Sequence, residues 1–103
     1  MARLVVAAAA DADTAGILTY VAGKAGKRTA VKYAELFEKL YDRLAVHPAI
    51  GALRPALGWN IRIGIVSPSI AIYRYTDNDD TVTVLRVVDG RRRISGAMLD
   101  AGV

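Results

Sequence analysis

The clearest pattern of apolar positions in the chain predicts a long amphipathic helix over residues 28–45. Apolar side chains recur there at steps of three and four, so they would share one face of a helix. They are Ala30, Tyr33, Phe37, Leu40 and Leu44, with Ala34 and Tyr41 widening the stripe. The helix is expected to end at His47–Pro48, because proline lacks an N–H donor and restricts the residue before it.

A second helical pattern precedes this one and predicts an antiparallel helical hairpin. Asp11 or Asp13 is expected to cap its start, because acidic side chains suit the first turn of a helix. Gly23 and Gly26 indicate its end and the short link to the next helix. Gly16 is costly inside a helix, so we interpret it as the mark of a close helix crossing.

After a loop at residues 50–58, apolar and β-branched runs predict three consecutive antiparallel strands. The first is residues 59–66, whose apolar face is expected to pack beneath the helices, with the tryptophan in the core. That face consists of Trp59, Ile61, Ile63 and Ile65. The other two strands, 69–75 and 82–88, flank a polar turn at 76–80. Residues 2–6 are a candidate short edge strand.

The 103 residues are expected to form a single domain of the α+β class. An N-terminal helical hairpin would cover one face of a small antiparallel sheet, made of the three-strand meander and the candidate edge strand. Residues 94–103 are expected to dock weakly or to fray.

The composition limits both the cellular compartment of the protein and the kinds of binding site that it can form. The chain has no cysteine, which excludes disulfides and thiolate metal sites and fits a reducing compartment. It has no apolar run near the ~20 residues that span a bilayer. The apolar start LVVAAAA is followed directly by Asp11 and Asp13, which argues against a signal peptide. We therefore expect a cytoplasmic protein, with no metal or cofactor.

The formal net charge is +4, and lysine and arginine are unevenly distributed along the chain, since all four lysines lie in the first half. After Ile50 every basic residue is an arginine, which binds carboxylates and phosphates through two parallel hydrogen bonds. An acidic partner, either a nucleic acid or an acidic protein tail, and a merely soluble surface are equally open interpretations.

Four motifs along the chain resemble one family. They are L-x-x-H-P-x-I-G-x-L-R-P at 44–55, I-R-I-G at 61–64, S-I-A-I-Y-R-Y at 69–75 and V-L-R-V-V-D-G-R-R-R at 84–93. Together they resemble the ParE-type toxins of the RelE/ParE toxin–antitoxin superfamily, over nearly the whole chain. One departure is Pro68, in a turn where relatives often have a glycine, and the fold is expected to survive it.

The resemblance implies a bacterial cytoplasmic toxin held inactive by a ParD-like antitoxin encoded next to it. ParE-type members poison DNA gyrase, whereas their RelE-type relatives cut messenger RNA in the ribosome. Either activity, or a toxin-derived binding module without activity, fits the family.

The residues themselves favour binding over catalysis. Arg62 and Arg86 match positions where RelE-type enzymes place phosphate-binding arginines, but arginine is a poor base. General acid–base catalysis needs another group, and His47 stands at a helix end. Tyr73 and Tyr75 are interpreted as core or sheet-face residues. We therefore assign no catalytic residue and expect a protein that is not an enzyme, without sequence-specific nucleic-acid binding.

Two sets of binding residues follow from the resemblance. Target binding is assigned to Arg62, Arg86, Arg91, Arg92 and Arg93. Antitoxin binding is assigned to Leu53, Leu57 and Arg74, and residues of the helical hairpin are expected to contribute. For Arg86 a structural salt bridge is the open alternative, and Arg74 is expected to pair with Asp77 or Asp79.

Overall fold

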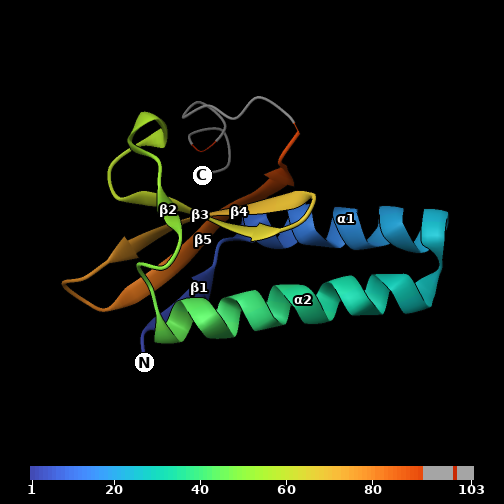
Figure 1. Cartoon of the computed structure of the whole chain (residues 1–103), viewed down its shortest axis with the longest axis horizontal. Coiled ribbons are helices and arrows are strands. Elements are labelled where there is room, and N and C mark those ends of the chain that lie inside the picture. The colour runs from blue at the N-terminus through green and yellow to red at the C-terminus, as the bar shows by residue number, and fades with distance from the viewer. Residues whose placement is uncertain (92–98, 100–103) are drawn as a thin grey trace.

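The computed structural model describes residues 1–91 and Leu99. A strand and a helical hairpin come first, and four further strands follow. The elements are β1 (Arg3–Val6), α1 (Ala8–Ala25), α2 (Lys27–Val46), β2 (Ala52–Leu53), the 3-10 helix η1 (Pro55–Leu57), β3 (Ile61–Val66), β4 (Ser69–Thr76) and β5 (Thr81–Asp89). Figure 1 shows α1 and α2 side by side, with their connecting turn beyond the end of the strands.

The five strands lie in the order β1-β5-β4-β3-β2. Antiparallel pairing of β3, β4 and β5 confirms the predicted meander, and the turn at Pro68 joins β3 to β4. The predicted edge strand is β1, which runs parallel to β5 and places Leu4 opposite Val82. The opposite edge, β2, falls in a segment expected to be a loop. The α+β prediction is therefore confirmed, with one additional short strand and with a mixed sheet in place of the expected antiparallel one, because β1 pairs in parallel.

The first helix begins earlier than its acidic residues predicted. α1 starts at Ala8 after Ala7, which makes no side-chain capping hydrogen bond, so the prediction of a cap at Asp11 or Asp13 is wrong. Asp11 lies within the first turn instead. The helix ends at Gly26, whose φ of 91° suits glycine and whose N–H donates to Ala22 O over 3.0 Å.

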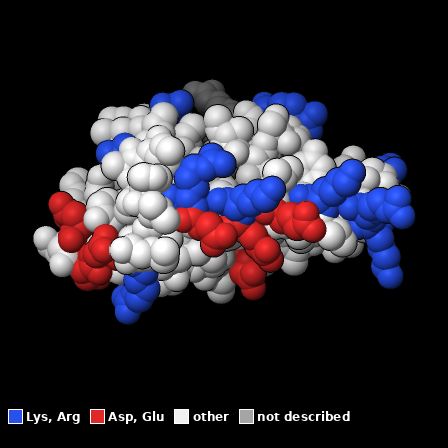
Figure 2. All heavy atoms as spheres, turned by 60° about the horizontal axis from the view of Figure 1, so that its bottom comes forward, with Lys and Arg blue, Asp and Glu red and all other residues white. Residues whose placement is uncertain are grey.

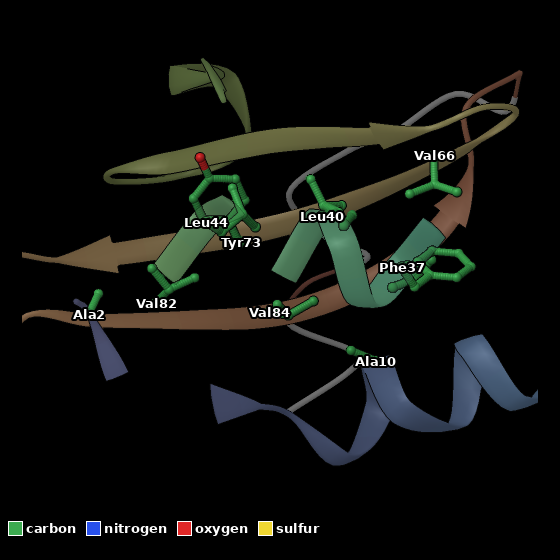
Figure 3. Packing of buried hydrophobic residues seen from close by; sticks show 11 residues of the cluster. Ala2, Ala10, Phe37, Leu40, Leu44, Val66, Tyr73, Val82 and Val84 are labelled. Carbon is green, nitrogen blue, oxygen red and sulfur yellow. The ribbon is translucent and has the colours of Figure 1, made fainter. Parts of the chain in front are cut away.

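The predicted apolar stripe of the second helix is confirmed as the centre of the main core. Figure 3 shows Phe37, Leu40 and Leu44 of α2 among buried side chains of β3, β4 and β5. Beneath Leu40 lies Gly64 of β3, where a Cβ would come within 2.9 Å of Leu40 Cδ1. The absence of a side chain at Gly64 therefore lets α2 pack close to the sheet.

The isoleucines of β3 face away from the helices, so their predicted placement beneath the hairpin is wrong. A second core cluster lies on the sheet face opposite the helices. It consists of Ile61, Ile63, Ile72, Val88 and Leu99, with Leu57, Ile70 and Leu85 packed against it. Gly64 and Val66 of β3 face the helices instead. Val66 belongs to the main core, and Gly64 lies against Leu40 of that core. Both sheet faces are thus apolar.

The same correction applies to the residues at either end of this face. Trp59 is 69% exposed, so its assignment to the core is wrong, and Ile65 is exposed as well. Leu99 is buried in the second cluster, whereas the remaining residues of the expected tail lie outside the described part of the chain. Across residues 1–91 and Leu99, no helix has the length and apolar character needed to cross a membrane.

Candidate functional site

Asp13 and Arg86 form the most highly connected polar contact between the helices and the sheet. Arg86 Nε donates to Asp13 Oδ2 over 2.7 Å and Arg86 Nη2 donates to Oδ1 over 3.1 Å. The backbone N–H of Val87 donates to the same Oδ2 over 3.0 Å. The two side chains are only 22% and 19% exposed, and the hydrogen bond to Asp13 raises the pKa of Arg86 above its ordinary value. Arg86 is therefore held, permanently charged, against α1.

An irregularity in β5 makes this contact possible. Ile72 of β4 lies opposite Arg86, but the next residue, Tyr73, lies opposite Val84. Leu85 is therefore an extra residue in the ladder, which is a β-bulge. With the bulge, Val84 and Val87 both enter the main core, and Arg86 reaches Asp13 between them.

A cavity of about 600 Å³ lies beside this pair, between α1 and the adjoining ends of β4 and β5. Its apolar lining includes Ile17, Val21 and Val88. Arg91 also lines it, 77% exposed, with Nη2 2.7 Å from Asp89 Oδ2, and this hydrogen bond raises the pKa of Arg91. The structure thus brings two of the predicted target-binding arginines to one cavity. Arg92 and Arg93 lie outside the described residues.

Arg62 belongs to a different part of the molecule. Its Nη1 donates to Ala49 O over 3.0 Å and to Gly51 O over 2.9 Å, in the loop that follows α2. In the sheet Arg62 lies opposite Tyr73, which lies opposite Val84. Two strand spacings, roughly 10 Å, therefore separate the strand of Arg62 from that of Arg86. The two arginines that match phosphate-binding positions do not converge.

Tyr73 also bonds to the loop that follows α2. Its hydroxyl accepts from Gly51 N over 2.9 Å and donates to Pro48 O over 2.9 Å. The side chain is fully buried, and this burial raises the pKa of the phenol. The hydroxyl of Tyr75 donates to Asp80 Oδ1 over 2.8 Å, which raises the pKa of Tyr75. Both hydroxyl groups therefore stabilise the conformation of a loop or turn.

The residues assigned to antitoxin binding surround the loop between β2 and β3. Leu53 is exposed on the edge strand and Leu57 is half-buried against the second core cluster. Arg74 Nε donates to Trp59 O over 3.0 Å, and no described ion pair joins it to Asp77 or Asp79, so that expected pairing is wrong. We call Leu53, Leu57, Trp59 and Arg74 the loop surface.

The exposed Trp59 is the residue that the sequence analysis missed. The loop that carries it is fixed, because Arg74 holds the Trp59 carbonyl and Asn60 Nδ2 donates to Tyr75 O. Asn60 also adopts a left-handed φ of 55°. Gly58 and Asn60, both loop-forming residues on either side of the tryptophan, were the available signal.

The polar side chains at these positions bond to other groups of the chain. Asp13, a carboxylate that lines the cavity, accepts hydrogen bonds from three donors of Arg86 and Val87. His47 is exposed at the end of α2, beside a hollow of about 520 Å³ that it lines with Ile50. Within the described part of the chain, no cluster of three or more His, Asp or Glu side chains could hold a metal ion.

Solved structures with the same fold come from toxin–antitoxin systems. A chain of the chromosomal ParDE system from P. aeruginosa superposes with a TM-score of 0.72 at 22% identity, over 86% of this chain and 96% of that one. A chain of the RelBE2 toxin–antitoxin complex from Mycobacterium tuberculosis superposes with a TM-score of 0.59 at 22% identity, over 85% and 96%. At this identity the likeness establishes the fold. No curated protein matches the chain.

The family comparison covers almost the whole domain. The profile described as "ParE toxin of type II toxin-antitoxin system, parDE" matches residues 4–94. This range includes both helices, every strand except the first residue of β1, and the motifs on which the resemblance was based. The chain therefore belongs to the ParE toxin family of type II toxin–antitoxin systems.

Proposed function

We propose that this chain is a toxin that inhibits DNA gyrase by binding to it, without an enzymatic step. The observation that supports binding most directly is the separation of Arg62 from Arg86. A ribonuclease site needs cations and a proton-transfer group around one phosphate. Here Arg62 is bonded to the loop after α2 and Arg86 to Asp13, on strands two spacings apart. Such an arrangement favours recognition over cleavage.

The gyrase-binding surface in this proposal is the end of β5. Arg91 extends into solvent at the mouth of the cavity, and its Asp89 contact is exposed enough to exchange for a partner's carboxylate. Arg92 and Arg93 follow directly in the sequence and belong to the same proposed set of target-binding arginines. Arg86 acts there indirectly, because it fixes β5 against α1.

A supercoiling assay with purified, antitoxin-free protein tests the proposal. We expect inhibition of gyrase with accumulation of cleaved DNA, and loss of that inhibition in an Arg91→Glu variant. Arg3→Glu, an equal charge change on the exposed edge strand β1, is the matched control and is expected to inhibit normally. Absence of inhibition by the unaltered protein, at concentrations well above those toxic in cells, would overturn the gyrase proposal.

A ParD-like antitoxin is the proposed neutralising partner, and the loop surface is its proposed contact. Exposed apolar side chains on a fixed loop suit a segment that orders as it binds and buries apolar residues. Co-expression with the product of the neighbouring gene is expected to yield a complex that restores growth. Purification of the chain alone from such cells would count against this partner. The proposed place of action is the cytoplasm.

The runner-up function is ribosome-dependent cleavage of messenger RNA. The fold similarity to a chain of the RelBE2 complex is the observation that favours it. Primer extension on transcripts after induction separates the two functions. Cleavage within minutes, before supercoiling changes, would replace the gyrase proposal, whereas intact transcripts in arrested cells would remove the ribonuclease.

A further inference from the structure

The turn between the helices carries a concentration of charge that the proposed function does not use. We call residues 18–32 the hairpin tip; it comprises the second half of α1, Gly26 and the first turns of α2. Figure 1 shows that it projects past the sheet, and Figure 2 shows basic side chains gathered at that end of the molecule. Its charged residues, all exposed, are Lys24, Lys27, Arg28 and Lys32.

The hairpin tip accounts for the whole net charge of the protein. It holds four basic residues and no acidic one, while the rest of the chain holds ten of each, and the formal net charge is +4. The remaining surface is therefore balanced. A field of one sign on a projecting element attracts a partner of the opposite sign and orients it on approach.

Helix stability accounts for Lys24, which stands in the last turn of α1, but it does not account for Lys27 and Arg28. Lys27 and Arg28 occupy the first turn of α2, which has no acidic residue, and Gly26 provides no side-chain cap. The start of a helix carries partial positive charge, so it favours acidic side chains and disfavours basic ones. The helix dipole therefore disfavours Lys27 and Arg28 at this position, which supports an external anion as their partner.

The apolar side chains of the hairpin tip argue against a membrane surface. Leu18 and Val21 are half-buried, and Ile17 and Tyr33, the residues that border the tip, pack against the core. Only Tyr20 and Val31 are large and strongly exposed among the tip residues, and Lys24 Nζ lies over the Tyr20 ring at 6.0 Å from its centroid. A membrane-surface helix needs a continuous apolar face, which is missing here.

We propose that the hairpin tip binds the phosphate backbone of double-stranded DNA without reading its sequence. Arg28 and Lys32 stand four residues apart on one face of α2, and Lys24 and Lys27 stand on either side of the turn. Four cations on a narrow element can each contact a phosphate and release counterions. This binding is separate from gyrase inhibition, although it would concentrate the toxin on the duplex that gyrase holds.

Fluorescence anisotropy with a labelled 20-base-pair duplex, titrated with the full chain at several salt concentrations, tests this proposal. With four phosphate contacts, log K is expected to fall with log salt at a slope of about −3.6, a loss of roughly 150-fold between 50 and 200 mM salt. The variant Lys27→Glu/Arg28→Glu is expected to bind at least ~10-fold more weakly, with a slope reduced by about 1.8. Its midpoint of thermal unfolding is expected to stay equal or to rise, because acids suit that turn.

The matched control is Lys39→Glu/Arg43→Glu, the same charge change in α2 beyond the hairpin tip. It is expected to retain most of the affinity. Equal weakening by both double variants would show that net charge alone attracts the duplex, and would overturn the assignment to the hairpin tip. Tighter binding to an acidic peptide or to anionic lipid vesicles than to the duplex would overturn the choice of partner.

Discussion

Asp13 and Arg86 connect the first helix to the last strand across 73 residues of sequence, with Arg86 Nε 2.7 Å from Asp13 Oδ2. The same carboxylate oxygen accepts from Val87 N, so one side chain bonds to two consecutive residues after the bulge. These contacts exist only once α1 lies on the sheet. The pair therefore reports on the completed fold rather than on local structure.

Arg86→Ala is expected to lower the free energy of unfolding by about 1–3 kcal/mol, because it removes charge-assisted hydrogen bonds and leaves a mostly buried carboxylate. Urea denaturation monitored by circular dichroism measures the change. Arg91→Ala is the control, since its exposed pair with Asp89 should leave stability unaltered. A loss of toxicity in Arg86→Ala without any loss of stability would assign Arg86 to target contact instead.

Tyr73→Phe is expected to cost about 1–3 kcal/mol of stability, because it leaves Gly51 N–H and Pro48 C=O without their partner. The loss of stability should be confined to the loop after α2. Hydrogen exchange of the Gly51 amide is therefore expected to accelerate more than that of amides in β4 and β5. Uniform acceleration across the sheet would contradict a loop-specific role.

Alkaline pH should destabilise the protein through the same tyrosine. Burial raises the pKa of Tyr73 above the ordinary 10.0, so the folded state favours the neutral phenol. This contribution is complete below the ordinary tyrosine pKa, and it is lost as pH rises through the raised, folded-state value. Denaturation curves across this range should show a smaller decline for Tyr73→Phe than for the unaltered protein. An equal decline in both would assign the effect to Tyr41 or Tyr75, whose pKa values are also raised.

The sequence predicted the two helices and the strands of the meander because each has a local signal, whereas the two-residue strand β2 has none. The stripe through Phe37, Leu40 and Leu44 follows the helical period, and the polar turn at 76–80 separates two β-branched runs. Which face of β3 is covered by helices has no such signal. Alternation places Ile61 and Ile63 on one face without saying which layer covers it, and here Leu57 and Leu99 do so.

The site was less predictable because its contacts are distant in sequence. The sequence made Asp13 a candidate helix cap, and only the folded chain shows that it lies within α1 and bonds to Arg86. The bulge at Leu85 that presents Arg86 leaves no mark in a run of Val and Leu. Arg74 likewise bonds to the carbonyl of Trp59 rather than to a nearby aspartate, and a carbonyl partner cannot be identified from residue type.

Replacing glycines by alanine should distinguish positions with free space for a Cβ from positions where a Cβ would meet other atoms. A Cβ at Gly16 in α1 would meet nothing within 4 Å, so the interpretation of Gly16 as a close crossing is wrong. Gly16→Ala is expected to stabilise the protein by up to ~1 kcal/mol through helix propensity. Gly64→Ala is expected to destabilise it by about 1–3 kcal/mol, because the new methyl group meets Leu40.

The cause of the Gly64 effect can be tested by coupling. Leu40→Val removes the δ-methyl carbons that the new Cβ at Gly64 would meet, so the double variant should be more stable than the sum of the single effects. Denaturant midpoints of the unaltered protein, the two single variants and the double variant complete a double-mutant cycle. Strict additivity would indicate that Gly64 is required for backbone geometry rather than for space.

Trp59→Ala is expected to weaken antitoxin binding by roughly 30-fold or more, as the loss of a tryptophan at an interface centre does. Stability should change by less than about 0.5 kcal/mol, because Trp59 is exposed and its loop is held through its backbone carbonyl and Asn60. Titration calorimetry with the purified antitoxin measures the affinity. Tyr20→Ala removes an equally exposed aromatic side chain from α1 and is expected to bind normally. If instead Tyr20→Ala weakens binding and Trp59→Ala does not, the antitoxin contacts the helices, and the loop surface has another partner.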